Sequence, residues 1–255
     1  MSSANGLAGR VAVVTGGGRG IGRALARGFA RAGAVPVIAD LNLDDAAAIA
    51  GEIAREGLRA LAVPVDVASA ESVAAMTAAA LAAYGRVDIL VNNAAKFSEL
   101  QYREFARIPL EEWKAVLDVN VTGAFLCVRA FEPHMRKAGW GRIVNVASGS
   151  IRMGRPHFLH YVSSKAALVG MSRSLARELG PHGITVNTLL PGVVFTELQQ
   201  KRLPEEYQRM ILNGQCIPEP LPPEAMVGPV LFLASDESRY VTGQELAVDG
   251  GLTHG

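Results

Sequence analysis

Residues 11–22, VAVVTGGGRGIG, run from an apolar stretch into a cluster of glycines, and the helical pattern of residues 23–32 follows. A buried strand, a tight turn and a helix N-terminus in this order are typical of a phosphate-binding site. Glycines let the backbone approach a pyrophosphate, and the first-turn N–H groups of the helix favour its negative charge. The spacing Gly16-x-x-x-Gly20-x-Gly22 is one residue wider at the front than the common dinucleotide fingerprint. A glycine cluster alone is often only a loop, but the flanking strand and helix favour a nucleotide site.

The next three predicted strands also end in polar or loop-forming residues. The strand 35–39 ends at Asp40, where a carboxylate can accept hydrogen bonds from the hydroxyls of an adenosine ribose. Asp40 could instead cap the helix 44–56, but Asn42 and Asp44 are better placed to do so. The carboxyl ends of parallel strands line a nucleotide crevice. The strands 60–65 and 87–91 bring two further segments to that edge, Asp66-Val67 and Asn92-Asn93-Ala94-Ala95.

Tyr161 and Lys165 are one helical turn apart, and Tyr161 follows Ser148 by 13 residues. A phenol and an ammonium at positions i and i+4 share one helix face. The fixed charge can therefore hold the phenol partly ionised near neutral pH, with a pKa well below the ordinary value of about 10. This predicts a proton-transfer role for Tyr161. The Tyr-x-x-x-Lys spacing alone is common on solvated helices, so the interpretation depends on the other motifs.

Strands and helices alternate along the chain without a linker, a repeat or a break in composition. We predict seven helices, over residues 20–32, 44–56, 70–84, 110–137, 160–179, 204–212 and 223–234. We predict seven strands, over residues 11–14, 35–39, 60–65, 87–91, 142–146, 184–190 and 245–248. Regular alternation favours right-handed crossovers and a parallel sheet covered on both faces. The expected fold is therefore a doubly wound, three-layer α/β sandwich, with residues 1–255 forming one domain and a substrate-binding segment at about 192–225.

Taken together, these features resemble the single-domain short-chain dehydrogenase/reductase family along almost the whole chain. The motifs that carry the resemblance are residues 15–22, Asp66, Asn92-Asn93-Ala94, Asp118-Val119-Asn120, Ser148, Tyr161 with Lys165, Asn187, Pro191-Gly192 with Thr196, Thr242-Gly243-Gln244 and Asp249-Gly250-Gly251. Several independent motifs in the right order argue against coincidence. Ala95 departs from the glycine that the family usually has at this position, which affects the expected loop shape. The resemblance implies a Rossmann-type sheet with strand order 3-2-1-4-5-6-7.

The resemblance also implies roles for four catalytic residues. Tyr161 is expected to exchange a proton with the substrate oxygen, to which Ser148 hydrogen-bonds. Lys165 is expected to bind the nicotinamide ribose and to lower the pKa of Tyr161. Asn120 interrupts an apolar helical stretch, so we expect a kinked helix held by a buried hydrogen bond. The family pattern adds a water at this kink that relays protons from Lys165.

The expected cofactor is NAD, with NADP less favoured, because the Asp40 carboxylate would repel a 2′-phosphate. Arg19 opposes this preference, since a basic residue there can partly neutralise the phosphate. We therefore expect a preference for NAD and no exclusion of NADP. The expected cofactor contacts are Gly16, Arg19, Gly20, Ile21, Gly22, Asp40, Asp66, Val67, Asn93, Ala94, Tyr161, Lys165, Pro191, Gly192, Val194 and Thr196.

Substrate contacts are expected from the loop after Asn93, the loop between Ser148 and Tyr161, and the segment after Gly192. These segments offer a largely apolar set, suited to a hydrophobic secondary alcohol or ketone. Its members are Phe97, Ser150, Met153, Phe158, Val193 and Leu198. Three cations in the same segments, Lys96, Arg152 and Arg155, can clamp a carboxylate or phosphate, although loop cations are more often solvated.

The composition agrees with a small-molecule enzyme. A chain of 255 residues is long enough for one α/β domain with a large core, and its net charge of +1 does not favour nucleic acid or an anionic membrane as a partner. Residues 1–9 lack an apolar signal core and no run is long enough to span a bilayer, so we expect a cytoplasmic protein. Cys127, Cys216 and the five histidines lack metal-ligand spacing, so we expect no metal.

Three functions compete at this point. The favoured one is an NAD-dependent dehydrogenase of a secondary alcohol or its ketone. A second is a 3-oxoacyl-thioester reductase, which normally uses the phosphorylated cofactor that Asp40 opposes. A third is a catalytically silent nucleotide-sensing or interaction protein, which the intact set of four catalytic residues disfavours. The resemblance further implies a homotetramer built from the helices 110–137 and 160–179 and from the C-terminal strand.

Overall fold

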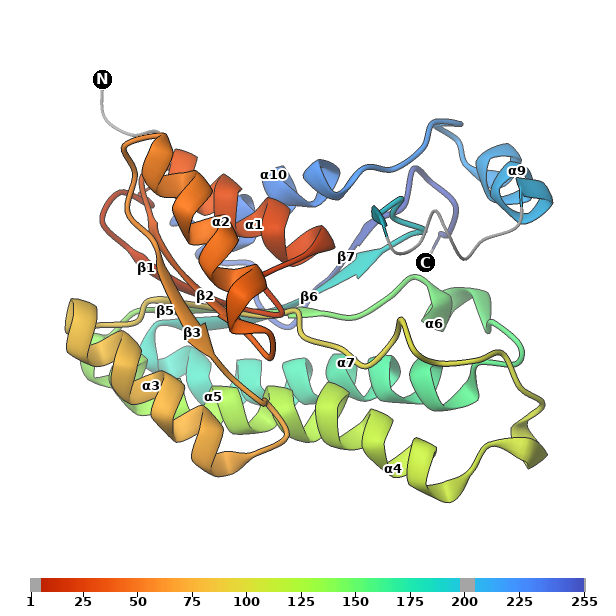
Figure 1. Ribbon diagram of the computed structural model, residues 1–255, viewed down its shortest axis with the longest axis horizontal. Coiled ribbons are helices and arrows are strands. Elements are labelled where there is room, and N and C mark those ends of the chain that lie inside the picture. Colours follow the sequence, from red (N-terminus) through yellow and green to blue (C-terminus); the bar gives the residue numbers. More distant parts are fainter. Residues whose placement is uncertain (1–5, 198–204, 255) are drawn as a thin grey trace.

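Seven parallel strands form one sheet in the computed structural model, which describes residues 6–197 and 205–254 (Figure 1). Their order is β3-β2-β1-β4-β5-β6-β7, as the resemblance implied. The strands are β1 (Val11–Thr15), β2 (Val35–Asp40), β3 (Leu61–Pro64), β4 (Ile89–Asn92), β5 (Gly141–Val146), β6 (Ile184–Pro191) and β7 (Glu245–Val248). The central strands are buried along their length, because helices cover both faces of the sheet.

Two layers of helices enclose the sheet, with α1, α2 and α10 on one face and α3, α4, α5 and α7 on the other (Figure 1). The helices of the first layer are α1 (Gly20–Arg31), α2 (Leu43–Arg55) and α10 (Val227–Leu233). Those of the second are α3 (Ala70–Tyr84), α4 (Leu110–Leu117), α5 (Gly123–Ala138) and α7 (Leu159–Leu179). The short α6 (Ser150–Met153) and α9 (Glu205–Gly214) lie near the carboxyl ends of β5 and β6. This arrangement confirms the predicted doubly wound α/β sandwich.

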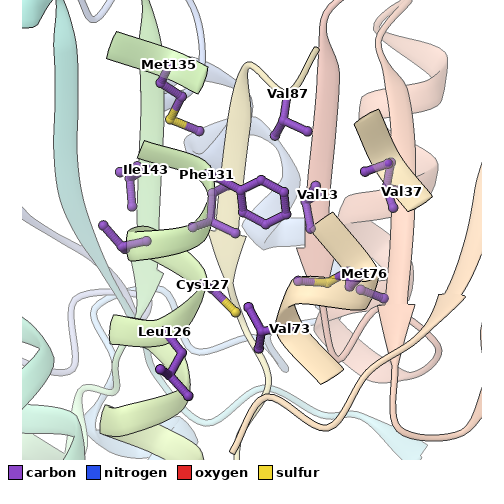
Figure 2. Close-up of a cluster of buried hydrophobic side chains, with 14 of the residues drawn as sticks. Val13, Val37, Val73, Met76, Val87, Leu126, Cys127, Phe131, Met135 and Ile143 are labelled. Carbon is purple, nitrogen blue, oxygen red and sulfur yellow. The ribbon is translucent and has the colours of Figure 1, made fainter. Parts of the chain in front are cut away.

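Alternate residues of β1 supply the two halves of the core. Val11 and Val13 belong to the cluster that includes α3 and α5, and Ala12 and Val14 belong to the cluster that includes α1 and α10. Figure 2 shows Phe131 of α5 beside Val13 in the first cluster. Phe131 is fully buried, which contributes roughly 2–3 kcal/mol relative to an exposed ring. The sheet is thus held from both sides, and its strand ends are fixed in space.

The predicted helices are confirmed with two differences. The single helix expected over 110–137 is divided into α4 and α5 by a π-helical turn, Asp118–Thr122. The helix expected over 223–234 begins as a 3-10 turn, Pro223–Met226, and continues as α10. The sequence pattern also missed α6, because four residues are too few for a helical period. No helix in the described part of the chain has the length and apolar character needed to cross a bilayer.

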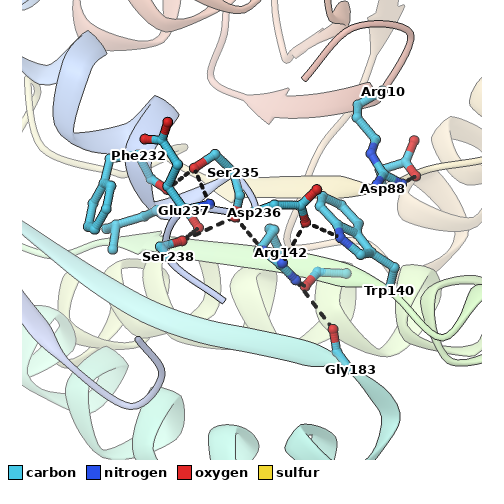
Figure 3. A network of polar contacts seen from close by, with 12 residues as sticks. Arg10, Asp88, Trp140, Arg142, Gly183, Phe232, Ser235, Asp236, Glu237 and Ser238 are labelled. Atoms are coloured by element: carbon cyan, nitrogen blue, oxygen red, sulfur yellow. Dashed lines mark hydrogen bonds and ion pairs between the residues drawn. The ribbon is translucent and has the colours of Figure 1, made fainter. Parts of the chain in front are cut away.

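A cluster of polar side chains lies at the amino-terminal edge of the sheet (Figure 3). The buried Arg142 guanidinium at the start of β5 donates to the carbonyl oxygens of Ser235 (3.0 Å), Gly141 (2.8 Å) and Gly183 (3.3 Å). It also lies 4.2 Å from the ring centroid of Trp140, whose Nε1 donates to the Asp236 carboxylate. These contacts join β5 to the segment after α10.

Candidate active site

The glycine turn after β1 is tied to the end of β4. The amide of Asn93 donates to the carbonyl oxygens of Thr15 and Gly16, each at 3.0 Å, and the backbone N–H groups of Asn93 and Ala94 donate to the Thr15 hydroxyl, each at 3.1 Å. Gly16 has φ of +61°, and a Cβ there would lie 2.9 Å from the Ala94 Cα. Only glycine therefore allows this close approach.

The N-terminus of α1 is left without a cap. Its N-cap residue, Arg19, makes no side-chain capping bond, and the first turn contains no acidic residue. By contrast, the side chain of Asn42 caps α2 and that of Ser69 caps α3. Among these three described helices, α1 alone keeps its first-turn N–H groups and its positive dipole end for an external anion. The turn and the helix together fit the pyrophosphate of a dinucleotide.

Asp40 ends β2 beside this turn. Its carboxylate accepts hydrogen bonds from the N–H groups of Gly18 (2.8 Å) and Asn42 (3.0 Å), which hold it in place. Each carboxylate oxygen keeps a further lone pair that can accept from a ribose hydroxyl. The alternative role of Asp40 as the cap of α2 is excluded, because the Asn42 side chain accepts from the first-turn N–H groups of that helix. Arg19 lies 3.2 Å from Asp45 through its Nε, so its charge is partly engaged.

Ser148, Tyr161 and Lys165 meet where β5 ends against α7. Ser148 lies close enough to Tyr161 for its hydroxyl to lower the pKa of the phenol, and the N–H of Ser150 donates to Ser148 Oγ at 3.2 Å. Lys165 Nζ donates to the Val146 carbonyl at 2.7 Å and lies 5.7 Å from the centroid of the Tyr161 ring. Tyr161 and Lys165 are both buried. The three side chains thus form one cluster at the carboxyl edge of the sheet.

The pKa of Tyr161 differs from the sequence expectation. Burial raises the pKa of Tyr161 to about 12, and the Ser148 hydrogen bond and the Arg155 charge lower it less than burial raises it. Burial also lowers the pKa of Lys165 to about 7. The expected depression of the phenol pKa by Lys165 is therefore wrong for this structure, because desolvation outweighs the nearby charges. At neutral pH the phenol keeps its proton.

Asn120 lies in the π-helical turn and is buried, as expected for a residue that kinks the helix. Its Oδ1 accepts from the N–H of Lys96 at 2.7 Å, and its Nδ2 donates to Ser164 Oγ at 2.9 Å. Ser164 Oγ in turn donates to the carbonyl oxygen of Tyr161 at 2.7 Å. The side chain of Asn120 therefore braces the helix that carries Tyr161 and does not line the cavity.

A cavity of about 400 Å³ connects the glycine turn to this cluster. Most of the predicted site residues line it. These are Gly16, Arg19, Gly20, Ile21, Asp40, Asp66, Val67, Asn93, Ala94, Ser148, Tyr161, Lys165, Pro191, Gly192, Val194 and Thr196, together with Phe97, Ser150, Met153 and Val193 from the substrate set. The Ser150 hydroxyl is buried and has no hydrogen-bond partner in the described part of the chain.

Two predicted contacts differ, and a third falls on a residue that the structure does not describe. Gly22 does not line the cavity. The glycine turn requires a glycine at this position, because a Cβ there would lie 2.0 Å from the Gly16 carbonyl oxygen. The expected substrate contact of Phe158 is wrong, since that ring is fully buried and packs with the ring of Tyr161 at a centroid distance of 5.0 Å. Leu198 lies outside the described residues.

The sequence did not predict several other residues of the cavity wall. They are Leu41, Val65, Glu99, Val119, Tyr207, Asp249, Leu252 and Thr253. The sequence analysis named Asp249 as part of a motif but predicted no role for its side chain. The structure shows Asp249 accepting hydrogen bonds from the N–H (2.9 Å) and the hydroxyl (2.6 Å) of Thr253. Among the described residues, no group of three or more His, Cys, Asp or Glu is placed to hold a metal.

Comparisons with known proteins find similarity along almost the whole chain. A family model described as enoyl-(acyl carrier protein) reductase matches residues 16–253. The (2S)-((R)-hydroxy(phenyl)methyl)succinyl-CoA dehydrogenase subunit BbsD of Thauera aromatica is 39% identical over 246 residues, which is 96% of this chain and 97% of that protein. The 3-oxoacyl-(acyl-carrier-protein) reductase of Synechocystis sp. is 37% identical over 254 residues, or 96% of this chain and 98% of that one.

A solved structure is similar over the same span. It is a putative NAD(P)-dependent gluconate 5-dehydrogenase from Beutenbergia cavernae with NADP bound at low occupancy. The two chains share 43% identity with a TM-score of 0.90, and the match covers 97% of this chain and 98% of the other.

Proposed function

Because this chain belongs to the short-chain dehydrogenase/reductase family of oxidoreductases, we propose that it transfers a hydride between NAD(H) and a secondary alcohol or its ketone. The observation that carries the proposal is the cluster of Ser148, Tyr161 and the buried Lys165 on the wall of a cavity that begins at an uncapped helix N-terminus. A proton donor next to a dinucleotide cradle would support hydride transfer coupled to proton transfer. A silent nucleotide sensor would not need it.

Each catalytic side chain has one task in this proposal. When bound, the nicotinamide supplies or accepts the hydride. Tyr161 gives its proton to the substrate oxygen during reduction and takes it back during oxidation, while Ser148 hydrogen-bonds to the same oxygen. The raised pKa of Tyr161 keeps the phenol protonated at neutral pH, which suits the acid that ketone reduction needs. Lys165 would hold the ribose, and the side chain of Asn120 positions the helix that carries Tyr161 through Ser164.

We propose NAD as the preferred cofactor because of Asp40. A 2′-phosphate about 4 Å from that carboxylate would cost on the order of 4 kcal/mol per unit charge at an effective dielectric constant near 20. A second hollow of about 350 Å³ shares Arg19, Asp40 and Leu41 with the main cavity, and we assign it to the adenosine. Arg19 limits the preference, because its guanidinium lines both hollows.

The substrate side of the cavity is assigned to the segment 192–225 and to the loops that carry Phe97, Ser150 and Met153. The relatives are named for an acyl-CoA, an acyl carrier protein thioester and gluconate, so their names do not agree on one alcohol. The Synechocystis relative supports 3-oxoacyl-thioester reduction as a second candidate, and the NADP bound in the Beutenbergia cavernae structure is compatible with NADPH as its reductant. Better turnover of a 3-oxoacyl thioester with NADPH than of free ketones with NADH would promote it. A cytoplasmic location stays a prediction.

A panel of secondary alcohols and ketones, assayed with NAD(H) and NADP(H) by absorbance of the reduced ring, tests the proposal. We expect kcat/KM to be higher with NAD(H). Tyr161→Phe keeps the packing of the ring but removes the proton donor, so kcat should fall by roughly 100- to 10,000-fold with little loss of cofactor affinity.

Tyr240→Phe is the matched control, because Tyr240 is 84% exposed and does not line the cavity. It should retain wild-type turnover. Near wild-type turnover by Tyr161→Phe would remove the proposed site. Cofactor binding without turnover across the panel would favour the nucleotide-sensing alternative.

A further inference from the structure

Three cations belong to the segments around the cavity, and they differ in whether a carboxylate pairs with them. Lys96 Nζ lies 2.8 Å from the Glu99 carboxylate, and Arg152 lies 3.8 Å from Glu245. Arg155 has no carboxylate within ion-pair distance in the described part of the chain, and residues 198–204 contain no Asp or Glu. Within the described part of the chain, the positive charge of Arg155 therefore remains available to a ligand.

Aromatic rings hold Arg155 in position without neutralising it. Its Cζ lies 4.9 Å from the ring centroid of Tyr102, 5.1 Å from that of Tyr207 and 5.6 Å from that of Phe158. Its Nη2 donates to the Tyr102 hydroxyl at 2.6 Å, the one side-chain hydrogen bond that it makes to the described residues. A guanidinium has five N–H donors, so most of them stay free.

The backbone directs this side chain into the site. The helix α6 ends at Gly154, whose φ of +59° turns the chain directly before Arg155. The N–H of Arg103 donates to the carbonyl oxygen of His157 at 2.9 Å, which joins the loop carrying Tyr102 to the loop carrying Arg155. Two loops distant in sequence thus hold the cation in place before any substrate binds.

Arg155 shares the cavity wall with the reacting group. Tyr161, Ser148 and Ser150 line the same cavity, and the charge of Arg155 is close enough to Tyr161 to lower the pKa of the phenol. Asp40 and Asp66, two acidic residues of the wall, lie at the strand ends beside the glycine turn. The other two, Glu99 and Asp249, are engaged by Lys96 and by Thr253. Arg155 therefore brings a positive charge to the substrate end of the cavity that these carboxylates do not pair with.

We propose that Arg155 binds a carboxylate of the substrate, so that the enzyme acts on a hydroxy acid or oxo acid whose secondary alcohol or ketone reaches Tyr161. The inference rests on the proposed hydride transfer at the alcohol or ketone of the substrate and on Arg155 at its carboxylate. One guanidinium matches the single charge and planar fork of a carboxylate. A phosphate dianion would keep part of its charge uncompensated.

The test uses hydroxy acids with two to five carbons between the carboxylate and the secondary alcohol, each compared with its primary amide. We expect wild-type kcat/KM to favour the best acid over its amide by about 10- to 200-fold, the usual range for a charged hydrogen bond. Arg155→Gln should lose this ratio, and Arg155→Lys should keep part of it. The ratio is the readout because Arg155→Gln also removes a charge that acts on Tyr161 and so affects acid and amide alike.

Arg152→Gln is the matched control, since Arg152 is paired with Glu245, and it should keep the wild-type ratio. Titration calorimetry of acid and amide against protein saturated with reduced cofactor gives a second readout independent of turnover. Equal kcat/KM for acid and amide, or an unchanged ratio in Arg155→Gln, would overturn the proposal. A higher kcat/KM for phosphate monoesters of the same alcohols than for the acids would show that Arg155 binds a phosphate and not a carboxylate.

These results separate the two proposals. Acid binding that depends on Arg155, without turnover of any compound, would support the anion site and refute the dehydrogenase. Equal turnover of amides and acids would support the dehydrogenase and refute the anion site.

Discussion

Lys165 carries a pH dependence of stability that can be measured without a substrate. Burial lowers its pKa from 10.5 to about 7 in the folded protein. Between these two pH values the unfolded chain keeps the proton and the folded chain has lost it, so stability rises with pH. Below pH 7 both states are protonated and the cost of burying the charge is fully present. Relative to Lys165→Met, the wild type should therefore gain about 3 kcal/mol between pH 7 and pH 10.

Urea unfolding of both proteins, purified without added nucleotide, at pH 6, 8 and 10 measures this difference. Other titrating groups are common to the two proteins and cancel. Equal changes in both proteins across the range would contradict the lowered pKa of Lys165. Tyr161 should stay a phenol over the same range, because burial raises its pKa to about 12.

At the level of the elements, the polar cluster in Figure 3 links β5 to the segment after α10 at the sheet edge opposite the active site. Arg142→Met removes the shared donor of three carbonyl oxygens. We expect a loss of about 2–4 kcal/mol in the free energy of unfolding, because buried acceptors are left without partners. The kcat below the unfolding transition should be unchanged, since the catalytic residues lie at the carboxyl edge.

Denaturant titration together with activity measures both effects. Arg55→Ala is the matched control, because Arg55 is exposed at the end of α2 and should change stability by less than about 0.5 kcal/mol. No loss of stability in Arg142→Met would show that the cluster does not join these elements. A lower kcat of Arg142→Met below the unfolding transition would contradict the separation of the cluster from the catalytic residues.

For the whole molecule we propose a homotetramer built from the helices 110–137 and 160–179 and from the C-terminal strand. Phe125 of α5 is 46% exposed and Leu159 at the start of α7 is 44% exposed, so apolar surface is available on two of these elements. Light scattering at micromolar concentration should give a mass near 108 kDa, four times the 26.9 kDa of one chain.

Phe125→Lys should lower this mass, because it places a charge in the proposed interface. Met210→Lys on α9 should not, although Met210 is 56% exposed. A wild-type mass near that of one chain would refute the tetramer.

Short-range patterns were enough to predict most of this structure. The glycine turn, the Asn42 cap and the alternation of strands and helices depend on neighbouring residues, so they could be predicted directly from the sequence. Contacts between distant segments set the rest. Glu245 pairs with Arg152 across more than 90 positions, whereas Arg155 has no carboxylate partner among the described residues. Burial likewise raised the pKa of Tyr161 and removed Phe158 from the cavity wall, because desolvation and packing depend on every segment that surrounds a side chain.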